Sequence, residues 1–134
     1  MIRELNIKTR SRVEFQEITD RVKEIVKDSK VESGICVVYV PHTTAGVMIN
    51  ENADPSVVED IAAQLEIIVP QAGNYQHSEG NSAAHIKASL IGSSTTVIIE
   101  YGEMALGTWQ GIFFGEFDGP RSRSVLVKII ADQT

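Results

Sequence analysis

Three histidines carry the greatest capacity for chemistry in this chain of 134 residues. His77 and His85 flank a polar stretch that leads into a short predicted helix, and His42 stands just past an apolar strand. His85 falls within one turn of the helix start, where the helix dipole favours the neutral imidazole that ligates metals. The spacing leaves two interpretations open, because it matches no standard metal signature. The three side chains either share one metal ion or hydrogen-bond separately to their own neighbours.

A pair of arginines near the end of the chain is a candidate anion site. Arg121 and Arg123 are two residues apart, so both project from the same side of an extended segment. Together with Lys87 and the amides that open the histidine helix, they could bind phosphate. The alternative is that they are rim charges, which pair with Asp118, Glu116 or a neighbouring subunit.

Two other reactive or acidic features have structural explanations. The acidic run 50–54 could hold a divalent metal, but we favour helix capping, with Asp54 as N-cap and Pro55 as the first helical residue. Asn50 is the member of this run that we expect to line a site. Cys36 lies inside an apolar run, so we interpret it as a small core residue in a reducing compartment.

The composition is that of one ordinary globular domain over residues 1–134, with 43% apolar and 22% charged residues. A net charge of −6 argues against a general nucleic-acid binder, because no basic face offsets it. The charged N-terminal segment does not resemble a signal peptide, and no apolar run approaches membrane-spanning length. We therefore expect a cytoplasmic protein without nucleic-acid or membrane partners.

Apolar spacing predicts three helices that would position these groups. The first has Thr19 as its cap and runs through residue 26, the second follows Pro55 to about residue 65, and the third covers residues 83–91. Asn81 or Ser82 would cap the third helix and Gly92 would end it. Large apolar side chains at 86 and 90 predict that these positions, with residue 83, form its buried face.

Alternating or continuous apolar runs predict the strands, at residues 5–7, 13–15, 35–40, 47–49, 95–101, 106–110, 112–117 and 125–130. We expect the run 35–40 to be buried on both faces and Trp109 to be a core residue. The loop 71–80 is long enough to be functional. The pattern predicts one α+β domain, an antiparallel-rich mixed β-sheet sandwich with about three helices.

Six polar blocks in this order resemble the YjbQ family over nearly the whole chain. They are His42-Thr-Thr-Ala-Gly46, Asn50-Glu-Asn-Ala-Asp-Pro55, His77-Ser-Glu-Gly-Asn-Ser-Ala-Ala-His85, Ser89-Leu-Ile-Gly-Ser-Ser94, Gly107-Thr-Trp-Gln-Gly111 and Glu116-Phe-Asp-Gly-Pro-Arg121. The resemblance implies a compact α+β domain that assembles as a homotrimer, with the polar motifs gathered in a pocket. Members of the family are commonly described as secondary thiamine-phosphate synthases.

The resemblance also implies roles for individual residues. The three histidines would converge on one divalent metal, zinc in the first place and magnesium as the alternative, with one ligand position open as in catalytic zinc sites. Glu79 would be the general base or a partner of a metal ligand. The substrate-binding residues would be Asn50, Asn81, Ser82, Gln110, Arg121 and Arg123.

Three functions are compatible with these residues. The first is a secondary thiamine-phosphate synthase, in which a thiazole nitrogen displaces diphosphate from an aminopyrimidine methylene carbon. That reaction needs charge neutralisation on the departing diphosphate. The second is a metal-dependent hydrolase of a small phosphorylated substrate, which a three-histidine site suits at least as well. The third is a non-enzymatic trimeric module that binds a metabolite or a metal.

Overall fold

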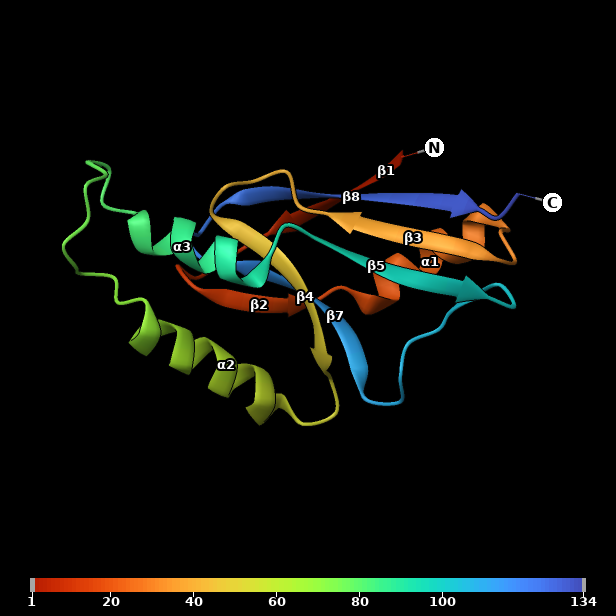
Figure 1. Cartoon of the computed structure of the whole chain (residues 1–134), viewed down its shortest axis with the longest axis horizontal. Coiled ribbons are helices and arrows are strands. Elements are labelled where there is room, and N and C mark those ends of the chain that lie inside the picture. Colours follow the sequence, from red (N-terminus) through yellow and green to blue (C-terminus); the bar gives the residue numbers. More distant parts are fainter. Residues whose placement is uncertain (1, 134) are drawn as a thin grey trace.

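Eight strands and three helices make up the computed structural model, which describes residues 2–133 (Figure 1). Residues 1 and 134 of the predicted domain lie outside this range. The strands are β1 (Ile2–Lys8), β2 (Glu14–Glu17), β3 (Gly34–Tyr39), β4 (Ala45–Glu51), β5 (Ser94–Glu100), β6 (Glu103–Met104), β7 (Gln110–Glu116) and β8 (Ser122–Ala131). The helices are α1 (Thr19–Ser29), α2 (Pro55–Ile68) and α3 (Ser82–Ile91).

The strands form two antiparallel sheets. One has the order β1-β8-β3-β5-β6 and the other the order β2-β7-β4. Every pairing among the described strands is antiparallel, so the α+β class is confirmed and the expected mixed sheet is wrong. β1 and β2 are not a hairpin, because β1 pairs with β8 while β2 pairs with β7 in the other sheet.

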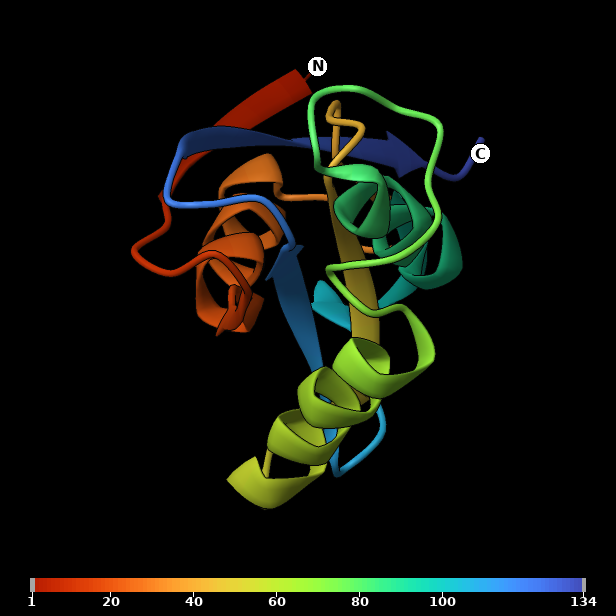
Figure 2. The same cartoon turned by 90° about the vertical axis from the view of Figure 1, so that its left-hand side faces the viewer.

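The core lies between α1, the inner face of the five-stranded sheet and the second sheet. Val22 and Val26 of α1, Cys36 and Val38 of β3, and Phe114 of β7 are buried in the same hydrophobic cluster. Full burial of such side chains contributes roughly 1.5–3 kcal/mol each. Figure 2 shows α1 beneath β1 and β8. None of the helices within residues 2–133 is both long and apolar enough to cross a membrane.

The outer face of the five-stranded sheet is uncovered. Ile35 and Tyr39 of β3 are 36% and 45% exposed, and Ile98 and Ile130 beside them are 62% and 44% exposed. The prediction that β3 is buried on both faces is therefore wrong. The continuous apolar run arose because this outer face, which no helix of the described chain covers, is itself rich in apolar side chains.

The predicted starts of the first two helices have different outcomes. Asp54 caps α2 as predicted, since its carboxylate accepts the Ser56 N–H at 2.9 Å, and Pro55 occupies the first turn. Thr19 does not cap α1, because the N-cap position is Ile18. The Thr19 hydroxyl instead donates to Glu17 and accepts the Ile112 N–H, which ties the helix start to β7.

The third helix buries its small residues. Ala84, Ala88 and Lys87 are buried, whereas Ile86 and Leu90 are 40% and 59% exposed. The predicted face of residues 83, 86 and 90 is thus wrong except for its first member. α3 packs closely on β4, where a Cβ at position 46 would meet the Gly92 carbonyl oxygen at 2.6 Å. Such a close approach leaves no room for any side chain at position 46.

Residues 105–109 connect β6 to β7, so the strand predicted at 106–110 is wrong except at Gln110, which begins β7. Gly107 and Gln110 close a turn, in which the Gly107 N–H donates to Gln110 Oε1 at 2.8 Å. Trp109 lies on this turn and is 63% exposed, which overturns its assignment to the core. The chain is crossing between two sheets here and has no neighbouring strand to pack against.

Candidate functional site

The three histidines line one cavity of about 810 Å³, at the end of the molecule that carries α3 (Figure 1). Three separate segments meet there: the connection after β3, the loop that leads into α3, and the turn before β8. We call it the histidine cavity, and its main polar residues are His42, His77, His85, Asn81, Arg121 and Arg123.

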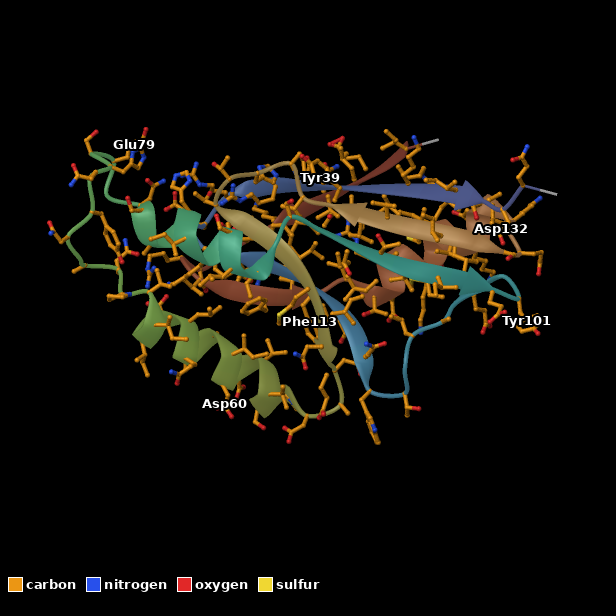
Figure 3. The ribbon with its side chains drawn as sticks, in the orientation of Figure 1. Tyr39, Asp60, Glu79, Tyr101, Phe113 and Asp132 are labelled. Atoms are coloured by element: carbon orange, nitrogen blue, oxygen red, sulfur yellow. The ribbon has the colours of Figure 1, made fainter. Side chains whose placement is uncertain are left out.

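His77 and His85 are neighbours in this cavity. Their ring centroids are 5.4 Å apart and the rings are nearly perpendicular, at 88°. Glu79 Oε2 lies 3.8 Å from His77 Nε2, which is beyond hydrogen-bond distance, and its side chain is 72% exposed. Figure 3 shows Glu79 at the tip of the loop before α3. The carboxylate is therefore close to the imidazole pair but not fixed to it.

The loop that carries His77 is fastened where it begins and ends. Gln71 Nε2 donates to the Gly80 carbonyl at 3.3 Å, and Arg12 Nη1 donates to Gln71 Oε1 at 2.9 Å. Within the loop, the Tyr75 hydroxyl donates to the Pro70 carbonyl at 2.5 Å. These contacts hold both ends of the loop beside α3, and so bring His77 to His85.

His42 is held in place by the sheet. Its Nε2 accepts the Ser124 N–H at 2.9 Å, just beyond the strand end that Pro41 terminates. Burial, and then the positive charge of Arg123, lower the pKa of His42 below its ordinary value. The ring is therefore neutral near pH 7, and a neutral ring that accepts at Nε2 carries its proton on Nδ1. His42 thus presents an N–H donor at Nδ1.

The predicted set of three histidines does not fit a metal ion in this arrangement. Within residues 2–133, no three histidine, cysteine, aspartate or glutamate side chains are close enough to hold one together. His77 and His85 can supply two ring nitrogens. His42 would first have to release the Ser124 hydrogen bond, because Nε2 is engaged and Nδ1 carries the proton.

Arg123 is rigidly held at the base of the cavity. Its Nε and Nη2 donate to the two carboxylate oxygens of Glu116 at 2.9 and 2.5 Å, and Nη2 also donates to the Thr44 hydroxyl at 2.8 Å. Glu116 is fully buried and also accepts from the Thr9 hydroxyl. Burial acts to raise the pKa of Glu116, but these hydrogen bonds outweigh it and lower the pKa below its ordinary value. Nη1 of Arg123 has no such partner among the described residues.

Arg121 stands at the rim and also has a carboxylate partner. It donates to Asp118 through Nε to the carbonyl oxygen at 2.7 Å and through Nη2 to Oδ2 at 2.9 Å. Asn81 Nδ2 donates to the same Oδ2, which leaves Asn81 Oδ1 buried without a donor among residues 2–133. Both arginines therefore line the cavity, as the anion-site interpretation expects. Both also pair with a carboxylate, Glu116 or Asp118, as the rim-charge interpretation expects.

The structure separates the remaining predicted residues from the histidines. Ser82 opens α3 but does not line the cavity, and Asn50 sits at the far end of β4, opposite Gly111. Gln110 lines a different cavity. Lys87 is fully buried and pairs with Glu66 of α2, so it does not reach the arginines.

Sequence reasoning missed the residues that support the site. Glu116 and Asp118 appeared only as possible partners of the arginines, and Thr44 was not singled out. Thr44 accepts from Arg123, whose partner Glu116 is 0% exposed. The only available signal was a glutamate within an apolar strand, which usually marks a buried carboxylate with a positive partner.

Comparison with known proteins identifies the family. The model of the UPF0047 protein YjbQ-like family matches residues 3–132. The chain belongs to this family. A UPF0047 protein of Methanocaldococcus jannaschii is 56% identical over 133 residues, covering 99% of this chain and 96% of that protein. YugU of Bacillus subtilis, another UPF0047 protein, is 46% identical over 131 residues, covering 97% and 99%.

Solved structures agree with the fold. A YjbQ/UPF0047 family crystal structure from Clostridium acetobutylicum is 57% identical with a TM-score of 0.93, covering 95% of this chain and 98% of that one. A structure from Sulfolobus solfataricus is 31% identical with a TM-score of 0.95, covering 98% and 97%. The first is described as uncharacterized and the second as a protein of unknown function. Family and fold are thus established, and the activity is not.

Proposed function

We propose that the histidine cavity is the active site of an enzyme that acts on a small phosphorylated substrate. The observation that supports this most is Arg123, which is held by a buried carboxylate while its Nη1 has no acceptor among residues 2–133. Arg121 and the neutral His42 lie in the same cavity. Each guanidinium is already paired with a carboxylate, so phosphate recognition depends on directed hydrogen bonds more than on net charge.

In this proposal, each side chain of the cavity has its own role in binding the substrate or in the reaction. Arg121 and Arg123 donate to phosphate oxygens, and His42 adds the donor at Nδ1. Asn81 Oδ1 accepts from a hydroxyl or amino group of the substrate. Glu79, beside His77 on the loop 71–80, would serve as the general base in the hydrolase alternative, where the attacking water must lose a proton.

The specific reaction that we propose is secondary thiamine-phosphate synthesis. The thiazole nitrogen forms a bond to the methylene carbon of an aminopyrimidine diphosphate while the carbon–oxygen bond to the diphosphate breaks. The electron pair of that bond leaves with the diphosphate. Arg121 and Arg123 stabilise the charge that gathers on the leaving group, so that no covalent nucleophile is required.

The test is diphosphate release from the aminopyrimidine diphosphate, measured with and without the thiazole phosphate. We expect release to require both substrates and to fall about a hundredfold in Arg121→Met. Arg21→Met is the matched control, because this exposed arginine of α1 lies outside the cavity. Release without the thiazole phosphate would favour the hydrolase, and binding without turnover would favour the non-enzymatic module.

A divalent metal, zinc in the first place, remains a proposal for the same cavity. His77 and His85 would hold it, and His42 would join them only after its ring turns away from Ser124. Bound zinc would act as a Lewis acid on a phosphoryl oxygen. Calorimetric zinc titration should show binding that is lost in His77→Ala and His85→Ala. Binding unchanged in both variants would refute the site.

We also propose that the chain assembles as a homotrimer through the outer face of the five-stranded sheet. Exposed apolar patches of this kind mark interaction surfaces, and Tyr39 belongs both to this face and to the cavity wall. Sedimentation equilibrium should give three times the chain mass of 14.7 kDa, and Ile98→Lys should dissociate the assembly. Ile67→Lys on α2, which is similarly exposed, is the control. A monomer at micromolar concentration would contradict the proposal.

A further inference from the structure

A second cavity lies on the α1 side of the molecule and has no role in the function proposed above. It measures about 950 Å³ and runs between α1 and the segment 101–110. Tyr101 stands at one end of it, at the opposite end of the long axis from Glu79 (Figure 3). We call it the α1 cavity, and the residues used below are Lys23, Lys27, Lys30, Tyr101, Glu32 and Glu103.

One wall of the α1 cavity is basic. Lys23 and Lys27 are four residues apart and share one face of α1, and Lys30 follows at the C-cap, so the three line about 10 Å of this wall. None of the three makes an ion pair within residues 2–133. Glu32 and Glu103 lie at the end beside the Tyr101–Gly102 turn, where Glu32 approaches Gly102. The cavity therefore has a basic flank and an acidic end.

Two residues that line this cavity occupy backbone conformations that disfavour them. Lys30 has φ 59° and Tyr101 has φ 53°, and they are the non-glycine residues with positive φ in the described chain. The helix end and the hairpin turn explain the conformation, but both positions normally prefer glycine or asparagine. Lysine and tyrosine therefore lower the stability of the fold at these positions, and both residues line the same cavity. Strain of this kind gathers at ligand-binding sites.

We propose that the α1 cavity binds a nucleotide, with its base at Tyr101 and its phosphates along the lysines. The exposed Tyr101 ring supplies a stacking surface, and Met104 and Leu106 supply apolar contact. Glu32 and Glu103 accept hydrogen bonds from an amino group of the base. Lysine ammonium groups are suitable point-charge partners for phosphates, and the volume is within the range of small-molecule sites.

Trp109 provides the readout for the test. It is the only tryptophan of the chain, it is exposed, and it stands between two residues that line the α1 cavity, Thr108 and Gln110. Titration of the full chain with ATP should change its fluorescence with saturation. Adenosine alone and inorganic triphosphate alone should each bind at least about tenfold more weakly, because each makes only half of the contacts.

Substitutions separate this cavity from a general effect on the fold. Tyr101→Asn should weaken ATP binding at least about tenfold while the melting temperature stays level or rises, because asparagine suits the turn. Lys27→Met should weaken ATP binding similarly. Arg10→Met, which removes one positive charge in the exposed connection between β1 and β2, should not. Absence of ATP binding at millimolar concentration, or unchanged affinity in Tyr101→Asn and Lys27→Met, would overturn the proposal. Loss of binding in Arg121→Met would assign the ATP to the histidine cavity instead.

Discussion

Replacing Arg123 with methionine removes the positive member of a buried ion pair while keeping most of the side-chain volume. Arg123 is 6% exposed and its partner Glu116 is 0% exposed. In the variant, Glu116 keeps the Thr9 hydroxyl and the Asp118 N–H as donors, but it loses both bonds from the guanidinium. A carboxylate without a counter-charge then remains in the interior.

The expected loss of stability is large. Breaking a buried pair by removing one partner costs about 3–5 kcal/mol, because the remaining charge is left uncompensated. For a domain of this size the melting temperature should fall by about 10–15 °C. Urea unfolding followed by circular dichroism measures the free energy directly. The double variant Glu116→Gln, Arg123→Met removes both charges and should recover most of the loss.

The loss should also depend on pH. In the native chain the pKa of Glu116 is lowered, so its stabilising contribution is present above its ordinary pKa and disappears as the pH falls through the lowered value. In Arg123→Met, burial raises the pKa, so the variant loses stability as the pH rises through the raised value. The difference between the two proteins should therefore be greatest at neutral pH and shrink towards about pH 4. An equal loss at both pH values, or a double variant as unstable as the single one, would refute the buried-charge explanation.

Three further substitutions and one chemical reaction test the fold. Trp109→Ala should cost less than about 1 kcal/mol in urea unfolding because the ring is exposed, whereas Phe114→Ala should cost about 3–5 kcal/mol. Burial raises the pKa of Cys36 to about 11, so a thiol reagent near neutral pH should react with it only after unfolding, and rapid reaction of the native chain would contradict the core position. Gly34→Ala should destabilise strongly in the same unfolding assay, because a Cβ there would meet the Ile130 carbonyl oxygen at 2.1 Å; a loss below about 1 kcal/mol would count against this packing.

Local chemistry was sufficient to predict most of the elements. The N-cap at Asp54 and the following Pro55 define the start of α2 without help from the rest of the chain. Gly92 ends α3 as predicted. The strand positions from β3 to β5 and from β7 to β8 also follow from apolar runs and turn residues. These features depend on neighbours within a few residues, which the sequence displays directly.

Which apolar side chains are buried depends on which faces of the helices and strands pack together. The spacing of apolar residues along the sequence could not predict that packing. Ile86 and Leu90 are the most hydrophobic side chains of α3, yet the face that packs inward carries Ala84, Ala88 and Lys87 instead. Trp109 and the outer residues of β3 are exposed because no element of the described chain packs on them. Hydrophobicity predicts that a side chain gains from burial, but only the packing decides whether a covering surface exists.

For the candidate site too, the sequence determines some features and the tertiary structure determines others. The types of its residues and the family blocks that contain them follow from the sequence. The convergence of His42, His77 and His85 on one cavity comes from tertiary structure. So does the engagement of His42 by Ser124, 82 residues later in the chain, and the burial of Glu116 beneath Arg123. The first contact joins segments distant in sequence, and the second joins β7 of one sheet to β8 of the other, so their geometry and their effects on pKa exist only once both sheets have formed.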